Sequence, residues 1–136
     1  MSKIIIKNKI KNFNKKIFVS GDKSLSIRWI LFASLASGVS KAQNLLISED
    51  VIAAINAIKK LGIKISIKNN ICKIYGQGID GYRYKKNLII NAENSGTLGR
   101  LILGFLINTP YPIKLIGDKS LSKRDFKRIS DPLSKF

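Results

Sequence analysis

The hydrophobic and polar positions of the chain predict helices and short strands that alternate along the sequence. An apolar run at residues 17–19 predicts a strand, and residues 25–36 (LSIRWILFASLA) are apolar nearly all round, which is typical of a helix buried on most sides. Residues 42–47 predict a second strand. Ser48 is a good N-cap for the next helix, whose apolar residues recur at helical spacing until a C-cap at Gly62.

The second half of the pattern begins with a β-hairpin. Ile alternates with Lys and Ser over residues 63–68, the pair Asn69-Asn70 tolerates the positive φ of a tight turn, and the sequence ICKIYG supplies the returning strand. The elements expected after the hairpin are a strand at 88–92, a mostly apolar helix at 98–107, a strand at 112–116 and a helix at 124–136. The fold class predicted is mixed α/β (α+β).

This order of elements contains a repeat. A β-α-β-α-β-β unit covers about residues 17–76, and a second, partial unit covers about residues 87–136. Equivalent positions are Gly21 with Gly96, Asp50 with Asp125, and Leu61 with Phe136. The second unit lacks its closing hairpin, which leaves a sheet edge unpaired and helix faces uncovered. We therefore expect the chain to be the N-terminal part of a longer protein.

The charge of the chain suggests an anionic partner. Its 136 residues include 25 basic and 8 acidic residues, for a formal net charge of +17. Such an excess fits nucleic acid, a membrane surface or a phosphorylated metabolite. The basic residues are mostly Lys and are scattered, without the aromatic and basic interleaving of RNA-recognition modules. We expect no nucleic-acid partner, although a basic nucleic-acid-binding module stays open as an alternative.

The Cys and His content and the N-terminal segment exclude several kinds of site. Cys72 is alone and the chain has no His, which excludes a disulfide framework, a Cys-based metal site and His-based catalysis within this chain. The N-terminal MSKIIIKNKIKNF is neither a secretory signal nor a membrane span. We expect a cytoplasmic protein without a metal site or a membrane partner. Cys72 itself is expected to be a small buried residue and not a nucleophile.

One basic octapeptide occurs twice, as GDKSLSIR at residues 21–28 and as GDKSLSKR at residues 117–124. The copies lie at different places in their units, so a structural duplication does not explain the match. Chance and parallel use as anion-binding segments both remain. The first copy lies where a strand passes into a buried helix, and free N–H groups there favour anions.

The side chains of the first copy suit an anion. Gly21 permits close backbone approach, Lys23 supplies a point charge, Ser24 supplies a hydroxyl, and Arg28 lies one helical turn further on. An Arg in an apolar run is costly to bury unless it is paired. The alternative is structural: Asp22 or Ser24 caps the helix and Arg28 pairs internally.

Two other segments have a similar character. Asn94-Ser95-Gly96-Thr97 again combines a strand end, a glycine, hydroxyls and a helix start, and Arg124 opens a basic cluster that runs to Arg128. Taken singly, helix capping explains the first and a solvated basic turn explains the second. Three such segments in one chain favour an anion-binding function.

Four ordered segments resemble a known family. They are SGDKSLSIRWILFASLASG, NLLISEDVIAAINAIKKLGIKI, NSGTLGRLILGFL and GDKSLSKRDFKRISDPLSKF. Together they resemble the N-terminal part of the 5-enolpyruvylshikimate-3-phosphate synthases (3-phosphoshikimate 1-carboxyvinyltransferases), from about Val19 to Phe136. The resemblance implies the enolpyruvyl transferase fold, in which repeated β-α-β-α-β-β units surround buried helices.

The resemblance also implies a reaction. The enolpyruvyl group of phosphoenolpyruvate passes to the 5-hydroxyl of shikimate 3-phosphate and phosphate is released, without a cofactor and in a full-length enzyme expected to be a monomer. The family's acid–base residues would lie beyond Phe136, so we expect no catalytic residue in this chain and no activity from it alone.

Binding roles follow from the resemblance residue by residue. Lys23 would contact both substrates, and Ser24 and Arg28 would bind shikimate 3-phosphate, with Arg28 on its carboxylate. Gly96 would line the phosphoenolpyruvate site. The remaining phosphoenolpyruvate contacts would come from Arg124 and, close by, Asn94.

The chain departs from the family in places. The family usually has Pro at Ser20, His at Ile27, Gly at Glu93 and Pro at Asp125. Glu93 would place a negative charge beside a phosphate site. The sibling UDP-N-acetylglucosamine enolpyruvyl transferases carry an Ala-Lys-Asn type segment in place of Asp22-Lys23-Ser24 and usually a Cys in the second GDKS loop, so the residues present disfavour them.

Overall fold

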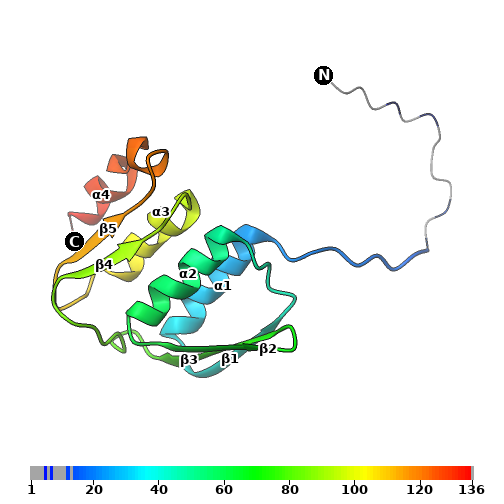
Figure 1. Ribbon diagram of the computed structural model, residues 1–136, viewed down its shortest axis with the longest axis horizontal. Coiled ribbons are helices and arrows are strands. Elements are labelled where there is room, and N and C mark those ends of the chain that lie inside the picture. The colour runs from blue at the N-terminus through cyan, green and yellow to red at the C-terminus, as the bar shows by residue number, and fades with distance from the viewer. Residues whose placement is uncertain (1–4, 6, 8–11, 13, 136) are drawn as a thin grey trace.

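The computed structural model describes residues 5, 7, 12 and 14–135, and there helices pack beside two small sheets (Figure 1). The elements are α1 (Lys23–Leu35), β1 (Ser37–Gln43), α2 (Glu49–Lys60), β2 (Lys64–Lys68), β3 (Ile71–Gln77), β4 (Leu88–Asn91), α3 (Gly96–Phe105), β5 (Ile113–Ile116), the short 3₁₀ helix η1 (Leu121–Lys123) and α4 (Lys127–Leu133). The mixed α/β class predicted from the sequence is confirmed.

The strands form two separate sheets. β3 lies between β1 and β2, and both pairings are antiparallel. The predicted hairpin joins β2 to β3, with Asn69 and Asn70 at φ 49° and 58°, as a two-residue turn of this type requires. β4 and β5 pair in parallel, with α3 between them in the chain. The division into repeated units at residues 17–76 and 87–136 stays a prediction.

The hydrophobic core lies where α1, α2 and α3 meet the strands. Ile30 of α1, Ile58 of α2 and Ile102 of α3 are fully buried. Ser34, a polar residue in this core, pairs with the hydroxyl of Tyr82 at 2.8 Å, so neither group is buried without a partner. Burial raises the pKa of the Tyr82 hydroxyl, while the hydrogen bond with Ser34 opposes that shift.

Helix α1 is buried or half-buried on most sides, as the sequence predicts, and only a narrow stripe of it is exposed. Leu25 and Phe32 are 66% and 67% exposed, although Phe32 packs edge-on against Phe105 at 5.2 Å between ring centroids. Arg28 lies on this exposed stripe too, so it has no burial cost to offset. The remaining sides of α1 pack against α2, β3 and α3.

Three predicted elements differ from the structure. The strand expected at residues 42–47 lies earlier, as β1, because pairing with β3 runs from Ser37 to Gln43 and Asn44 at φ 58° follows its end. Residues 17–19 form no strand, and their side chains are 69%, 88% and 72% exposed. A strand needs a neighbouring backbone, and within the described residues the segment gains only a hydrogen bond from Asn44 Nδ2 to Val19 O at 3.1 Å. The predicted helix at 124–136 begins later, at Lys127, whose N–H donates to Asp125 Oδ1 at 2.8 Å. Phe136 lies outside the described residues.

Candidate functional site

Three helix N-termini point to one edge of the molecule. Helices α1, α2 and α3 run in roughly the same direction, so their first turns share that edge (Figure 1). An ion pair joins two of these turns, because Lys23 Nζ at the start of α1 lies 2.7 Å from Asp50 Oδ2 at the start of α2. Each helix start carries a partial positive charge. The edge therefore suits anionic ligands.

The turn that opens α1 is fastened to the loop after β1. Asp22 Oδ1 accepts a hydrogen bond from the N–H of Leu25 at 2.7 Å and so caps the helix. Ser26 Oγ donates to Asp22 O and accepts from Leu46 N–H, at 2.7 and 3.1 Å. A Cβ at Gly21 would overlap the carbonyl oxygen of Asn44. The close approach expected at Gly21 is thus to the chain's own backbone.

The basic side chains of this turn are at the surface and have partners within the chain. Lys23 is 51% exposed beside Asp50, and the guanidinium of Arg28 donates to Ser24 Oγ. These contacts confirm the structural alternative, in which Asp22 caps the helix and Arg28 pairs internally. They do not exclude ligand binding, because exposed side chains can exchange one partner for another.

A second cluster forms around the start of α3. Ser95 Oγ caps that helix by accepting from Leu98 N–H at 3.2 Å. The side chain of Arg124 lies directly against buried Gly96, so closely that a Cβ at Gly96 would overlap Arg124 Nη1. Arg124 Nη2 also donates to Asn94 Oδ1 at 3.4 Å. The fold brings together three of the four residues that the resemblance assigns to phosphoenolpyruvate, Asn94, Gly96 and Arg124, while the fourth, Lys23, lies in the other cluster.

An acidic residue that the sequence analysis missed belongs to this cluster. Asp118 accepts hydrogen bonds from Leu121 N–H at 2.6 Å and from the Asn94 amide at 2.5 Å. The Leu121 N–H, then the Asn94 amide and more weakly the charge of Arg124 lower the pKa of the Asp118 carboxyl. The Asp118 carboxylate thus holds the amide of Asn94, whose oxygen accepts from Arg124.

The two copies of the repeated octapeptide share one capping hydrogen bond. Asp22 accepts from the N–H of Leu25, and Asp118 accepts in the same way from Leu121. The two copies differ at one position, where the first has buried Ile27 and the second has exposed Lys123. Burial of Ile27 extends the first turn into α1, while the second turn ends as η1. Asp capping of a turn thus gives the repeat a structural basis.

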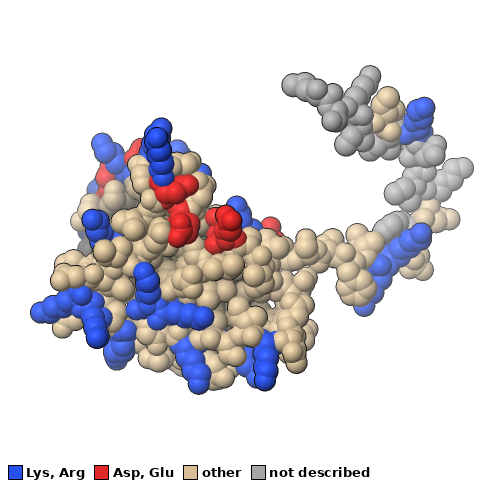
Figure 2. Space-filling model, in the orientation of Figure 1, with Lys and Arg blue, Asp and Glu red and all other residues tan. Residues whose placement is uncertain are grey.

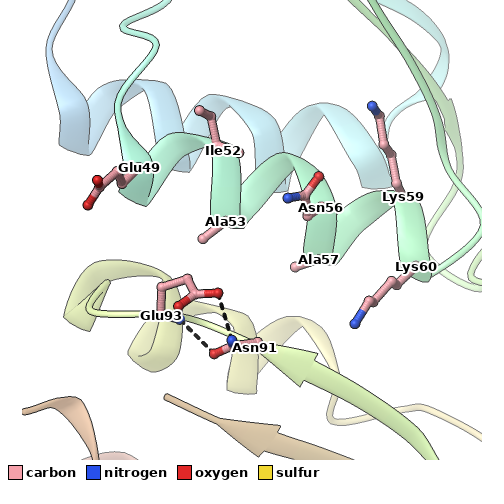
Figure 3. A pocket seen from close by; sticks show the side chains of 9 residues that line it. All are labelled: Glu49, Ile52, Ala53, Asn56, Ala57, Lys59, Lys60, Asn91 and Glu93. Carbon is pink, nitrogen blue, oxygen red and sulfur yellow. Dashed lines mark hydrogen bonds between the residues drawn. The ribbon is translucent and has the colours of Figure 1, made fainter. Parts of the chain in front are cut away.

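A groove between α2 and β4 lies beside these clusters (Figure 3), since the Asp118 N–H donates to Glu93 O at 2.8 Å. Its lining residues are Glu49, Ile52, Ala53, Asn56, Ala57, Lys59, Lys60, Asn91 and Glu93. Glu93 Oε1 accepts from the Asn91 amide at 2.7 Å, and its backbone has a positive φ of 50°. The groove contains none of the residues assigned to substrates. The Glu93 carboxylate thus lies at the wall of this groove, hydrogen-bonded to Asn91.

Neither cluster suggests a metal centre. In residues 14–135 and the few described before them, no group of three or more His, Cys, Asp or Glu side chains is placed to hold a metal ion. Cys72 is buried, as expected, and burial raises the pKa of its thiol, with the charge of Lys59 opposing the shift. No helix in the described part of the chain is long and apolar enough to cross a membrane.

Comparison with known proteins connects these clusters to a family. The family model described as EPSP synthase (3-phosphoshikimate 1-carboxyvinyltransferase) matches residues 7–136. The chain belongs to the EPSP synthase family. A 3-phosphoshikimate 1-carboxyvinyltransferase of Bacillus cytotoxicus is 42% identical over 123 residues, which are 90% of this chain and 29% of that protein. One from a Sulfurihydrogenibium species is 40% identical over 93% of this chain and 29% of that protein.

Solved structures give the same result. An EPSP synthase from Acinetobacter baumannii superposes with a TM-score of 0.81 at 36% identity, over 89% of this chain and 28% of that structure. The predicted enolpyruvyl transferase fold and family resemblance are confirmed. The chain spans less than a third of the length of these family members. The roles of individual site residues, and the effects of Ser20, Ile27, Glu93 and Asp125, stay predictions.

Proposed function

We propose that this chain supplies the N-terminal part of an enzyme that transfers the enolpyruvyl group of phosphoenolpyruvate to the 5-hydroxyl of shikimate 3-phosphate. A carbon–oxygen bond forms to that hydroxyl, the carbon–oxygen bond to phosphate breaks, and phosphate leaves. The observation that carries the proposal is the contact of Arg124 with Gly96 at the first turn of α3. This contact places a guanidinium at a helix start, where an anion could bind, in a chain that belongs to the EPSP synthase family. We call this place the α3 corner.

The proposed phosphoenolpyruvate corner combines three kinds of group. Arg124 offers a planar guanidinium that can hold a phosphate or carboxylate through paired hydrogen bonds. Gly96 keeps the helix start free of a side chain, and Asn94 holds Arg124 from the side. The first turn of α3 adds its helix dipole. Asp118 neutralises part of this charge until the substrate binds.

The proposed shikimate 3-phosphate contacts come from the start of α1. Ser24 and Arg28 are hydrogen-bonded to each other, and binding would replace that contact by contacts with the phosphate and carboxylate of the substrate. Lys23 would contact both substrates after leaving Asp50. No hydrogen bond or ion pair links the two clusters within the described residues. The substrates themselves would therefore bridge them.

Catalysis would need groups that this chain does not supply. We propose that the acid–base residues lie in the part of the family's chain that this one does not span, because the match covers only 29% of the Bacillus cytotoxicus relative. The 136-residue chain alone should then release no phosphate. A cytoplasmic location and a monomeric full-length enzyme remain predictions.

A chimera tests the proposal directly. Residues 1–136 would replace the matching N-terminal 29% of the Bacillus cytotoxicus relative, and phosphate release would be followed with both substrates present. We expect release that needs shikimate 3-phosphate and phosphoenolpyruvate together, and none from the 136-residue chain. A folded chimera without activity would contradict the proposal. Activity with UDP-N-acetylglucosamine as the acceptor would support the sibling family instead.

A further inference from the structure

The three-stranded sheet has one covered face and one open face. Cys72 and Ile74 of β3 are 1% and 0% exposed and face the helices, so Lys73 and Tyr75 face outward. The strand register then gives three outward rows across β1, β3 and β2. These rows are Lys41–Lys73–Ser66, Val39–Tyr75–Lys64 and Gln43–Ile71–Lys68.

The outward rows form a basic surface, which we call the sheet face. It carries Lys41, Lys64, Lys68 and Lys73, and β1, β2 and β3 contain no acidic residue. In the view of Figure 2, Lys and Arg project along the side where the sheet lies, while the visible Asp and Glu gather near the helix starts. Lys41 and Lys73 are direct cross-strand partners. Such like-charge pairs destabilise a sheet, so an external anion would stabilise this one.

An aromatic ring lies in the middle of the sheet face. Tyr75 is partly exposed on the central strand, between Val39 and Lys64 of its row. The ammonium group of Lys64 lies 5.2 Å from the centre of the Tyr75 ring. Neighbouring strands are about 4.8 Å apart and outward residues of one strand about 7 Å apart, so the lysines surround the ring closely.

We propose that the sheet face binds single-stranded nucleic acid, with Lys41, Lys64, Lys68 and Lys73 on phosphates and a base stacked on Tyr75. Basic grooves combined with an aromatic platform are how single strands are bound without sequence preference. Lys64 would move from the ring to a phosphate when the base stacks. The lysines are scattered along the sequence, and the strand register gathers them. This surface contains none of the residues assigned to the enolpyruvyl transfer.

The same charges could attract an anionic membrane, but the geometry favours a single strand. Membrane-surface binding buries an apolar face in the interface beside its basic residues. On the sheet face Val39 is the only outward apolar residue that is largely exposed among the described positions, and Tyr75 lies partly covered between its neighbours. A partly covered ring cannot insert into a bilayer, whereas its exposed side can stack with a base.

Fluorescence anisotropy with a labelled oligouridylate tests the proposal on the 136-residue chain. The test variant changes Lys41, Lys64, Lys68 and Lys73 to Gln, and the control changes the exposed Lys85, Lys114, Lys127 and Lys135 to Gln, which removes the same net charge. We expect the test variant to lose about tenfold or more in affinity and to lower the slope of log affinity against log salt by about 3, at about 0.7 per phosphate contact. The control should keep most of the affinity and the slope.

Two further measurements separate the alternatives. Tyr75→Leu should weaken binding about tenfold, and Tyr75→Phe should restore it, because stacking needs the ring and not the hydroxyl. Equal losses in the test and control variants, or no binding by the parent chain, would overturn the proposal. So would equal sensitivity of Tyr75→Leu and Tyr75→Phe, or tighter binding to phosphatidylserine vesicles than to the oligouridylate. Circular dichroism confirms that each variant is folded.

Discussion

The carboxylate of Asp50 lies 2.7 Å from the ammonium group of Lys23 and joins the first turns of α2 and α1. Asp118 acts differently in the other cluster, where it accepts from the Asn94 amide, whose oxygen in turn accepts from Arg124. We expect substrate binding to displace Asp50 from Lys23, so that the affinity depends on how strongly this acid competes.

Asp50→Asn should strengthen substrate binding. The ion pair is partly exposed and contributes only about 0.2–1 kcal/mol to folding, so the variant should stay folded. Without the carboxylate Lys23 is free for substrate, and the KM of the chimera for shikimate 3-phosphate should fall by a factor of about 1.4 to 5, corresponding to the same energy. Glu49→Gln is the control, because Glu49 starts the same helix but lines the α2 groove. A higher KM in Asp50→Asn would show instead that Asp50 orients Lys23.

Gly96→Ala should impair phosphoenolpyruvate binding selectively. The added Cβ would overlap Arg124 Nη1, and that flexible side chain would move aside. Loss of one well-placed charged hydrogen-bonding group costs about 1.5–3 kcal/mol, so KM for phosphoenolpyruvate should rise at least about tenfold.

Gly104→Ala is the matched control for that change, because a Cβ at Gly104 meets nothing within 4 Å in the same helix. It should leave both KM values unchanged and slightly stabilise the helix. Equal effects of the two substitutions, or a rise only in the KM for shikimate 3-phosphate, would contradict the assignment of the α3 corner.

Glu93→Gly should stabilise the chain more than Glu93→Ala does. Both variants lose the charge and the hydrogen bond with Asn91, but only Gly relieves the left-handed backbone at φ 50°. This conformation costs a residue with a Cβ about 1–2 kcal/mol. Chemical denaturation should give Glu93→Gly the larger free energy of unfolding, by about 1 kcal/mol. Equal stability of the two variants would mean that the backbone at Glu93 relaxes in solution.

Acid pH should destabilise the second cluster by protonating Asp118. Its pKa in the folded chain is below the ordinary 3.8, chiefly because the Leu121 N–H hydrogen-bonds to the carboxylate. The stabilisation is therefore fully present above the unfolded pKa and is lost as pH falls through the folded pKa. Carbon NMR should give Asp118 a titration midpoint below 3.8. Asn has no carboxyl group to protonate, so Asp118→Asn should lack the acid-dependent destabilisation of η1 that comes from this residue.

The local elements were predictable because local signals determine them. Asn69 and Asn70 specify the hairpin turn, and Gly62, whose φ is +89°, ends the segment after α2. The expected strand at residues 17–19 was wrong because an apolar run does not reveal whether a partner strand is present. The exposure of Arg28 could not be predicted for a related reason, since an apolar sequence does not show which side of a helix its neighbours cover.

The candidate site was predictable only in part. The glycines, hydroxyls and arginines at helix starts could be recognised in the sequence, and the resemblance assigned their ligands. The acids at Asp50 and Asp118 could not, because their contacts join different elements of the fold. The sheet face is a similar case: Lys41 and Lys73 become neighbours only through the register of β1 and β3.

The most direct test of the substrate site compares Lys23→Ala with Lys119→Ala in the chimera. Both lysines follow the capping Asp of a GDKSLS segment, so the substitutions remove the same charge from beside the same cap, at the start of α1 and in the turn before η1. We predict that Lys23→Ala lowers kcat/KM by about a hundredfold or more, as loss of a charged substrate contact of about 3 kcal/mol implies, while Lys119→Ala has little effect. Equal losses, or full activity in Lys23→Ala, would contradict the proposal that the first GDKSLS segment is the one that binds both substrates.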